Sequence, residues 1–460
     1  MGIQNFPAAL QPIIQQNMLE REFHEALRSR LAYRQIADRE AFSGNIGETL
    51  IKTRAGLKPT IKVPLAASTN TNLDNGLTSS GWGVEQYSLT VNQYGDTIDL
   101  NTVTSRVGIV GQFLQNAFVN GEQAARSMDE LARNALFQSY GGGNTRVRVT
   151  GTLQPVVQVD DVRGFVQAPV NGVMIAVSAG NQLTVVVGAN TYTLNTAVAD
   201  GVQAAAQVVA GSIAPIGMTF SGASVNSSTT PGGFSGALTF SANVTVADQT
   251  IGNTVTAPNA PSVIRPSGRG NTSLLTAADA LTMGNLLDAV AQLRLNNIPE
   301  VNGAYNCYLD PKSARQLFAD PDFKQLFQGT TSATPVFKAG LVNDFLGLRF
   351  MPTTEAYTQT LTGVGTVRRP IICGQGALIE GGFSDIAHTD VTPADSIISM
   401  VDGVAMVTRE PLDRLQQIVA QSWYWIGGYC TPSDVTTNST TLPTATNATF
   451  KRAVMIEHIG

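Results

Sequence analysis

One segment of this 460-residue chain is a strong helix candidate, and its length limits the folds that can contain it. Along residues 105–139, apolar side chains recur on one face at intervals of three, four or a doubled interval. Thr104 or Ser105 can cap the start, and Gly141-Gly142-Gly143 ends the helix. At 1.5 Å per residue it is about 50 Å long, much longer than the usual three turns. We therefore expect an axis on which smaller elements are placed. Its apolar face comprises Val107, Val110, Leu114, Phe118, Ala125, Met128, Leu131 and Leu136.

A second segment carries almost no charge. Between Thr150 and Ser262 the only charged residues are Asp160, Asp161, Arg163, Asp200 and Asp248. Short alternating segments separated by Gly, Asn, Ser and Pro predict a small β-sandwich or barrel inserted into the chain. Residues 197–214 are a candidate helix within it, and the linker TAPNAPSVIRPSGRGN ends it.

The chain before the long helix predicts two further elements. Residues 12–42 are expected to form a helix; acidic residues interleave with its five arginines, which favours a solvated helix with ion pairs over a nucleic-acid surface. In residues 48–100, KPTIKVPL predicts a strand, and a polar loop leads to two strands that meet near Gly95-Asp96. This long two-stranded arm is marginal in isolation, so it should lie on its own body or on a neighbour. The arginines are Arg21, Arg28, Arg30, Arg34 and Arg39.

After the linker, helices and strands alternate. Residues 276–296 predict an amphipathic helix stopped by Pro299, followed by the strand AYNCYL. Asp310-Pro311 and Asp320-Pro321 each combine an N-cap with proline at the first helical position. The remainder is mostly strand. Within it Trp423-Tyr424-Trp425 cannot form one stacking platform, because neighbours on a strand face opposite sides, so core packing or a subunit contact is expected.

Composition excludes several classes of protein. Charged residues make up 14% against an average near a quarter, while 43% are apolar, so a disordered chain is not expected. No apolar run is long enough to span a bilayer, and MGIQNFPAALQPII lacks the features of a signal peptide, which favours a cytoplasmic site of synthesis. A net charge of −5 gives no general attraction for nucleic acid.

No pattern of catalytic or metal-binding residues emerges. The cysteines Cys307, Cys373 and Cys430 are odd in number and far apart, and the three histidines are dispersed. No P-loop, nucleophile-elbow or zinc-protease motif occurs. His388-Thr389-Asp390 reads as a surface loop, and a cation site is not favoured at the helix-starting aspartates around Asp310, Asp320 and Asp322. We expect no catalytic residue, metal or cofactor.

The order of elements resembles the major capsid (coat) protein of tailed double-stranded-DNA bacteriophages, the Hong Kong 97-type fold, in the subgroup with an inserted β-domain. The resemblance is carried by NCYLDPKSARQLFADPDFKQLFQG, VFKAGLVNDFLGLRFMPTTEAYT and RRPIICGQGALIEGG. It implies an α+β fold divided into an N-terminal helical arm (1–47), an extended β-arm or E-loop (48–102), a spine helix (103–146), the inserted domain (147–268) and an axial and peripheral region (269–460).

The resemblance also implies a function and partners. The chain would self-assemble through hexamers and pentamers into the icosahedral virion capsid, in the host cytoplasm, with portal and scaffolding proteins, non-specifically held double-stranded DNA, a possible decoration protein and no membrane. A virion decoration or adhesion protein whose β-insert binds a surface glycan is the alternative, and an unrecognised enzyme a distant third. Candidate subunit contacts are Lys52, Arg54, Lys58, Lys62, Trp82, Tyr87 and Tyr94.

Overall fold

The structure is a computed structural model, and two compact units make up the chain. Unit 1 contains residues Met1–Leu50, Leu89–Leu136 and Leu378–Cys430, and unit 2 contains Ile51–Ser88, Phe137–Ala377 and Thr431–Gly460. The structure describes residues 32–42, 49–62, 84–101, 112–199, 235–324, 344–383, 398–409, 417–443 and 448–460, except 59, 142, 163, 171–172, 258–259, 271, 346, 362–363, 433 and 438–439.

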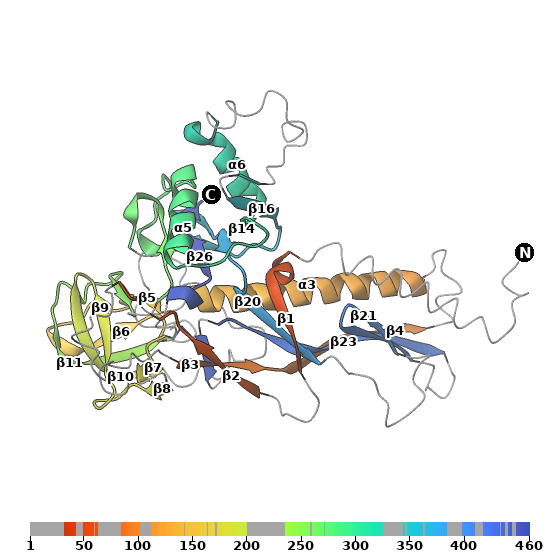
Figure 1. The fold of residues 1–460 in the computed structure, drawn as a ribbon, viewed down its shortest axis with the longest axis horizontal. Helices are drawn as coiled ribbons and strands as arrows, with labels where there is room; N and C mark the ends of the chain where they lie inside the picture. The colour runs from red at the N-terminus through yellow and green to blue at the C-terminus, as the bar shows by residue number, and fades with distance from the viewer. Residues whose placement is uncertain are drawn as a thin grey trace, which may run out of the picture. The chain divides into compact units, whose positions relative to one another are not determined.

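Unit 1 is built on a six-stranded sheet against which a long helix packs (Figure 1). Its strands, in spatial order, are β1 (Ala37–Phe42), β20 (Leu378–Phe383), β23 (Ile418–Cys430), β22 (Val404–Arg409) and β21 (Ile398–Val401), with β4 (Asn92–Asn101) also paired to β23. The β1–β20 pair is parallel, and the other pairs are antiparallel. Trp423 and Trp425 are buried on one face of β23, so the expectation of core packing is confirmed.

The long helix is confirmed as α3 (Gln112–Tyr140), which is 29 residues and about 43 Å long. Residues 102–111, which hold the predicted start, lie outside the described residues. Ala124, Ala125 and Met128 enter the same core cluster as the tryptophans of β23. The predicted stripe was wrong at Phe118, which is 40% exposed, because the small residue Ala117 occupies the buried position beside it.

The predicted turn at Gly95-Asp96 is wrong. Strand β4 continues through both residues and pairs along its whole length with β23, placing Gly95 opposite Tyr424. A Cβ on Gly95 would lie 2.6 Å from the Trp423 carbonyl oxygen, closer than real Cβ contacts. The glycine therefore allows close strand approach rather than a chain reversal.

The N-terminal helix does not extend to residue 42. A 3₁₀ turn, η2 (Tyr33–Ile36), leads directly into β1, whose six residues pair with β20. The rest of the predicted helix, residues 12–31, lies outside the described residues. Pairing with a strand far along the chain overrides the local helix preference at residues 37–42.

The arm, most of which belongs to unit 2, consists of β2 (Thr49–Ala55) and β3 (Val84–Thr90), which pair only with each other among the described strands. The strand predicted within KPTIKVPL is wrong where it is described, because residues 56–58 and 60–62 have no regular structure and the strand comes earlier. A two-stranded sheet leaves unpaired backbone groups along both outer edges.

The charge-poor segment forms a six-stranded sheet with its own hydrophobic core. The strand order is β5 (Asn144–Arg146), β12 (Thr254–Thr256), β9 (Leu183–Val187), β10 (Asn190–Ala199), β11 (Gly236–Val244) and β6 (Gln154–Val159). The outer strands meet through a Val147–Val159 bridge, and the Arg148 N–H donates to the Gln158 carbonyl over 2.8 Å. The sheet therefore closes into a small barrel, which we call the barrel. The insert bounds 147–268 stay a prediction, and residues 200–214 of the candidate helix lie outside the described residues.

The remaining α+β core of unit 2 surrounds a second six-stranded sheet (Figure 1). Its strands are β13 (Val263–Ile264), β26 (Ala453–Ile456), β19 (Ile371–Cys373), β14 (Tyr305–Leu309), β16 (Leu348–Pro352) and β15 (Asp344–Phe345). The predicted linker is not wholly irregular, since β13 lies within it and pairs with β26. Helices α5 (Met283–Leu295) and α6 (Pro311–Ala319) contribute to the core, and Asp310 caps α6 as predicted.

Further short strands complete unit 2. They are β17 (Thr358–Leu361), β18 (Gly365–Arg368) and β27 (His458–Ile459) in one sheet, and the pairs β7 (Gln167–Val170) with β8 (Val173–Ala176) and β24 (Asp434–Thr437) with β25 (Thr440–Pro443). Among the described residues, no helix has the length and apolar character needed to cross a membrane.

Gly95→Ala should destabilise the protein by about 1–3 kcal/mol, because the new methyl group meets a strand backbone that has no room to move. Gly284→Ala in α5 is the matched control: its nearest other atom lies 3.7 Å away, and alanine favours the helix by about 0.5–1 kcal/mol. Urea unfolding of both variants measures the difference. Equal stability of Gly95→Ala and the wild type would contradict the close approach of Gly95 to the backbone of Trp423.

Candidate functional site

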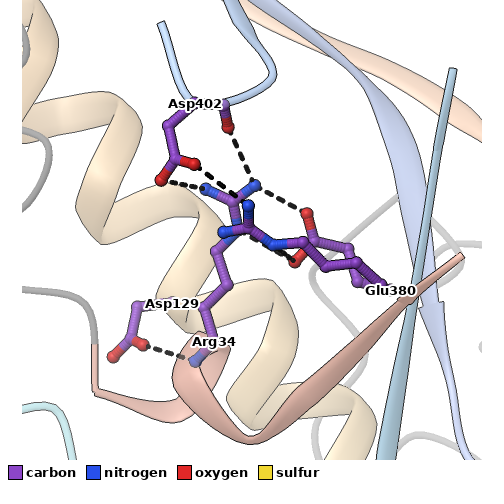
Figure 2. A network of polar contacts seen from close by, with 5 residues as sticks. Arg34, Asp129, Glu380 and Asp402 are labelled. Atoms are coloured by element: carbon purple, nitrogen blue, oxygen red, sulfur yellow. Dashed lines mark hydrogen bonds and ion pairs between the residues drawn. The ribbon is translucent and has the colours of Figure 1, made fainter. Parts of the chain in front are cut away.

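A buried ion-pair network anchors the point where the N-terminal segment joins unit 1 (Figure 2). Arg34 donates from Nε and Nη2 to the two carboxylate oxygens of Glu380, over 2.9 and 2.6 Å. Its Nη2 also donates to the Asp402 carbonyl over 3.3 Å. Arg39, which is half exposed, donates to the Asp402 carboxylate over 3.0 Å. Both arginines therefore tie β1 and the turn before it to β20 and to the β21–β22 turn.

The carboxylate of Asp129, on α3, binds the backbone at the same place (Figure 2). Its Oδ1 accepts hydrogen bonds from the N–H groups of Ala32, Tyr33 and Arg34 over 2.9, 2.6 and 3.2 Å. These are N–H groups at the start of the 3₁₀ turn, which lack partners within it. One helix side chain thus fixes the backbone at residues 32–34 within unit 1.

Burial sets the electrostatics of this anchor. Desolvation raises the pKa of Asp129 above its ordinary value, and the three backbone hydrogen bonds together with the charge of Arg133 offset only part of that effect. For Arg34, burial alone would lower the pKa, but the hydrogen bond to Glu380 and nearby negative groups outweigh it and raise the pKa. Arg34 therefore stays charged, because its bidentate partner stabilises the guanidinium.

At the arm, the structure gives two of the predicted contact residues a role inside the chain. Arg54 of β2 is 5% exposed and lies over two aromatic rings, with its guanidinium carbon 5.1 Å from the centre of Phe450 and 6.0 Å from that of Tyr87. Tyr87 is itself buried. Phe450 lies three residues before β26 in the second six-stranded sheet of unit 2, so the stack joins the arm to the core of unit 2. Arg54 and Tyr87 are therefore buried in contacts within the chain, and a role for them between subunits stays a prediction.

The other predicted contacts are scattered. Lys58 and Lys62 are exposed after β2, and Lys52 is half-buried. Tyr94 lies in unit 1 and stacks on Trp425 with ring centres 5.9 Å apart, so it belongs to that core. Trp82 lies outside the described residues.

Sequence reasoning missed the exposed apolar side chains of the arm. Ile51 is 64% exposed, Leu57 is 58% exposed and Ile61 is 89% exposed. The exposed lysines Lys58 and Lys62 directly follow Leu57 and Ile61 in the sequence. The alternation in KPTIKVPL predicted a strand with its lysines on one side and Ile61 on the other, and it did not indicate whether either side is exposed. Among the described strands none covers these side chains, which local alternation does not report, and they remain exposed.

Polar clusters elsewhere serve the fold. Ser313 Oγ lies 2.8 Å from His458 Nε2 and donates to Asp310, and all three side chains are buried, which keeps any substrate away from the hydroxyl.

Burial raises the pKa of Cys307 to about 12, which leaves its thiol unreactive. In the described part of the chain no group of three or more His, Cys, Asp or Glu could hold a metal ion, and His388 and Asp390 lie outside that part.

Asp129→Ala should cost about 2–4 kcal/mol of unfolding free energy, because three N–H groups lose their acceptor in a buried site. Asp129→Asn keeps an acceptor oxygen and should cost less. The raised pKa means that the folded wild type retains its proton to higher pH than the unfolded chain, so its stability declines as pH rises from the ordinary aspartate pKa through the raised value. Urea unfolding across pH 3–8 should show this decline in the wild type and not in Asp129→Asn; identical profiles would contradict the assignment.

Arg54→Ala should lower stability by about 1–3 kcal/mol, since it removes both ring contacts and the buried aliphatic stem. Arg54→Lys is the matched control, which keeps the charge but not the planar group that stacks on the rings, and it should recover only part of the loss. Thermal unfolding measures both. Full recovery by lysine would show that charge alone, without stacking, holds the arm.

Comparisons with known proteins give a distant structural likeness. No protein-family model and no curated protein matches the chain. Among solved structures, the chain is similar to the capsid of cyanophage P-SCSP1u (TM-score 0.46, 10% identity, covering 92% of this chain and 86% of that one) and the capsid of Ralstonia phage GP4 (0.46, 9%, 94% and 92%). It is also similar to the cyanophage Pam1 capsid asymmetric unit (0.45, 11%, 95% and 91%). Because these TM-scores lie below 0.5, the superpositions alone carry no conclusion about this chain.

Proposed function

We propose that this chain is the major capsid protein of a tailed double-stranded-DNA bacteriophage and that its copies assemble into an icosahedral shell around the genome. The observation that carries the proposal is the arm. Its strand β2 exposes Ile51, and the segment after β2 exposes Leu57 and Ile61. Several large apolar side chains exposed within one short stretch of chain are typical of a surface that a partner covers. The chain acts as a structural protein rather than as an enzyme.

The arm combines a firm base with an uncovered surface. Arg54 holds the base against Phe450, while the alternate residues of β2 remain exposed. Lys58 and Lys62 add positive charges beside the apolar side chains, which suits acidic groups on a neighbouring copy. A contact of this kind, repeated around a closed shell, adds up over many copies although each one is weak.

Further partners follow from a shell of this kind. Copies would group into hexamers and pentamers during assembly in the host cytoplasm, guided by scaffolding protein and built onto a portal. Packaged DNA would meet the inner wall without sequence-specific contacts, and a decoration protein could bind outside. The resemblance of the C-terminal sequence motifs to phage coat proteins supports these partners.

The test is assembly of the full chain. Purified protein, expressed alone and with a candidate scaffold, should form capsomers or closed particles in sedimentation velocity and negative-stain microscopy. A species that stays monomeric at high concentration under both conditions would contradict the proposal.

Ile61→Asp should abolish or strongly reduce particle formation while leaving the melting temperature of the unassembled chain unchanged, because the side chain is 89% exposed. Leu295→Asp on α5, at a side chain that is 75% exposed and outside the arm, is the matched control for an apolar-to-acidic change. The fraction of protein in particles is measured by sedimentation. Equal assembly of Ile61→Asp and the wild type would exclude the arm from subunit contacts.

A further inference from the structure

The barrel buries all of its described charged residues. Residues 144–257 contain seven charged side chains, of which the structure describes five. All five are buried, with exposed fractions between 1% and 9%. The surfaces of small domains are typically about a quarter to a third charged, which keeps them soluble. The described surface of the barrel has no exposed charge. The five are Arg146, Arg148, Asp160, Asp161 and Asp248.

The buried charges hold the barrel together. Arg146 donates from Nε to Asp160 over 2.6 Å where the first and last strands meet. Asp248 accepts hydrogen bonds from Tyr192, Asn190 and Thr245, over 2.5, 2.8 and 2.7 Å, and so fixes the turn after β11. These five charges make their contacts inside the fold, so the described surface of this charge-poor barrel carries no charge.

Threonine and valine dominate one side of the barrel. On β9, Thr184 and Val186 alternate with the buried Leu183, Val185 and Val187. The register places Val186 beside Thr191 of β10 and beside Thr256 of β12, and places Thr184 beside Thr193. We call this set the outer face; it comprises Thr184, Val186, Thr191, Thr193, Val198 and Thr256. Val186 is 40% exposed and Val198 is 61% exposed.

We propose that the outer face binds the same face of the barrel on a second copy of this chain, across a two-fold axis. Close to the axis of a two-fold contact each residue meets its own copy, so a charge on Val186, placed near the axis, would face an identical charge and be repelled. A face of threonine and valine avoids that conflict, and β-branched side chains on a sheet pack well against a second sheet. The contact presupposes the shell proposed above, which holds copies side by side.

A partner of another kind fits this face less well. Partners that meet by diffusion gain speed and selectivity from complementary charges, and the outer face offers none. Copies already held in a shell have a high effective concentration and need no such steering. A glycan would favour an exposed aromatic ring, but the Tyr192 ring packs against Phe240 and its hydroxyl binds Asp248.

Val186→Lys tests the contact in the full chain. It places like charges across the axis, so about tenfold more protein should be needed to form particles, and those particles should dissociate at lower urea. Val186→Thr keeps the face uncharged and should assemble as the wild type does. Val246→Lys, at a side chain that is 52% exposed in the turn after β11 and is not part of the outer face, adds the same charge to the barrel and should also assemble normally. Circular dichroism of the unassembled variants checks that each one folds.

Mixed assembly separates a self-contact from any other partner. Particles formed from Val186→Lys and Val186→Glu together should regain the urea resistance that each variant loses alone, because opposite charges then meet across the axis. Failure of the mixture to recover, equal loss in Val246→Lys, or unaltered particles of Val186→Lys would each overturn the inference while the wild type still assembles. A wild type that never assembles would instead refute the shell itself, and the contact with it.

Discussion

Two paired strands cannot bury both of their own faces, so the arm needs another surface to cover its exposed side chains. The arm formed by β2 and β3 has no further strand on either edge among the described residues, and Ile51 is largely exposed. Its base is nevertheless fixed, because Arg54 lies between aromatic rings of the arm and of the segment before β26. A two-stranded element that keeps alternate side chains of β2 exposed gains stability when another molecule covers them.

Several oppositely charged side chains pair inside the protein. Arg34 and Glu380 are buried in unit 1, and Arg146 and Asp160 are buried in the barrel. In unit 2, Glu457 is buried between Arg265 and Arg369, whose charges and hydrogen bonds outweigh burial and lower its pKa to about 2. Buried pairs of this kind add little net stability over apolar packing, but removing one partner is costly, so they specify which segments meet. The same placement leaves the outer face of the barrel free of charge for contact with an identical surface.

Local signals in the sequence predicted local structure well. Helix α3 was recognised because its periodic pattern is long, and Asp310-Pro311 marked the start of α6 because cap and proline act within one turn. The closed barrel followed from alternation and turn residues, although alternation could not distinguish it from a sandwich.

Structure that depends on distant partners could not be predicted in this way. Gly95 was interpreted as a turn because the residue it approaches, Trp423, is far along the chain. Arg34 was counted among surface arginines, since its partner Glu380 lies 346 residues away. Asp129 carried no signal, because its role is to accept backbone N–H groups from a segment 95 to 97 residues earlier. The anchoring networks of the site are therefore the part that sequence patterns left hidden.

Hydrogen–deuterium exchange of the arm, compared between unassembled chain and assembled particles, tests whether another copy covers this surface. The amides of residues 49–62 and 84–90 should exchange at least about tenfold more slowly in particles, since backbone groups on the free edges and beside exposed side chains lose their access to water. Unchanged exchange in these residues, in particles that are otherwise intact, would show that the arm plays no part in joining one molecule to the next.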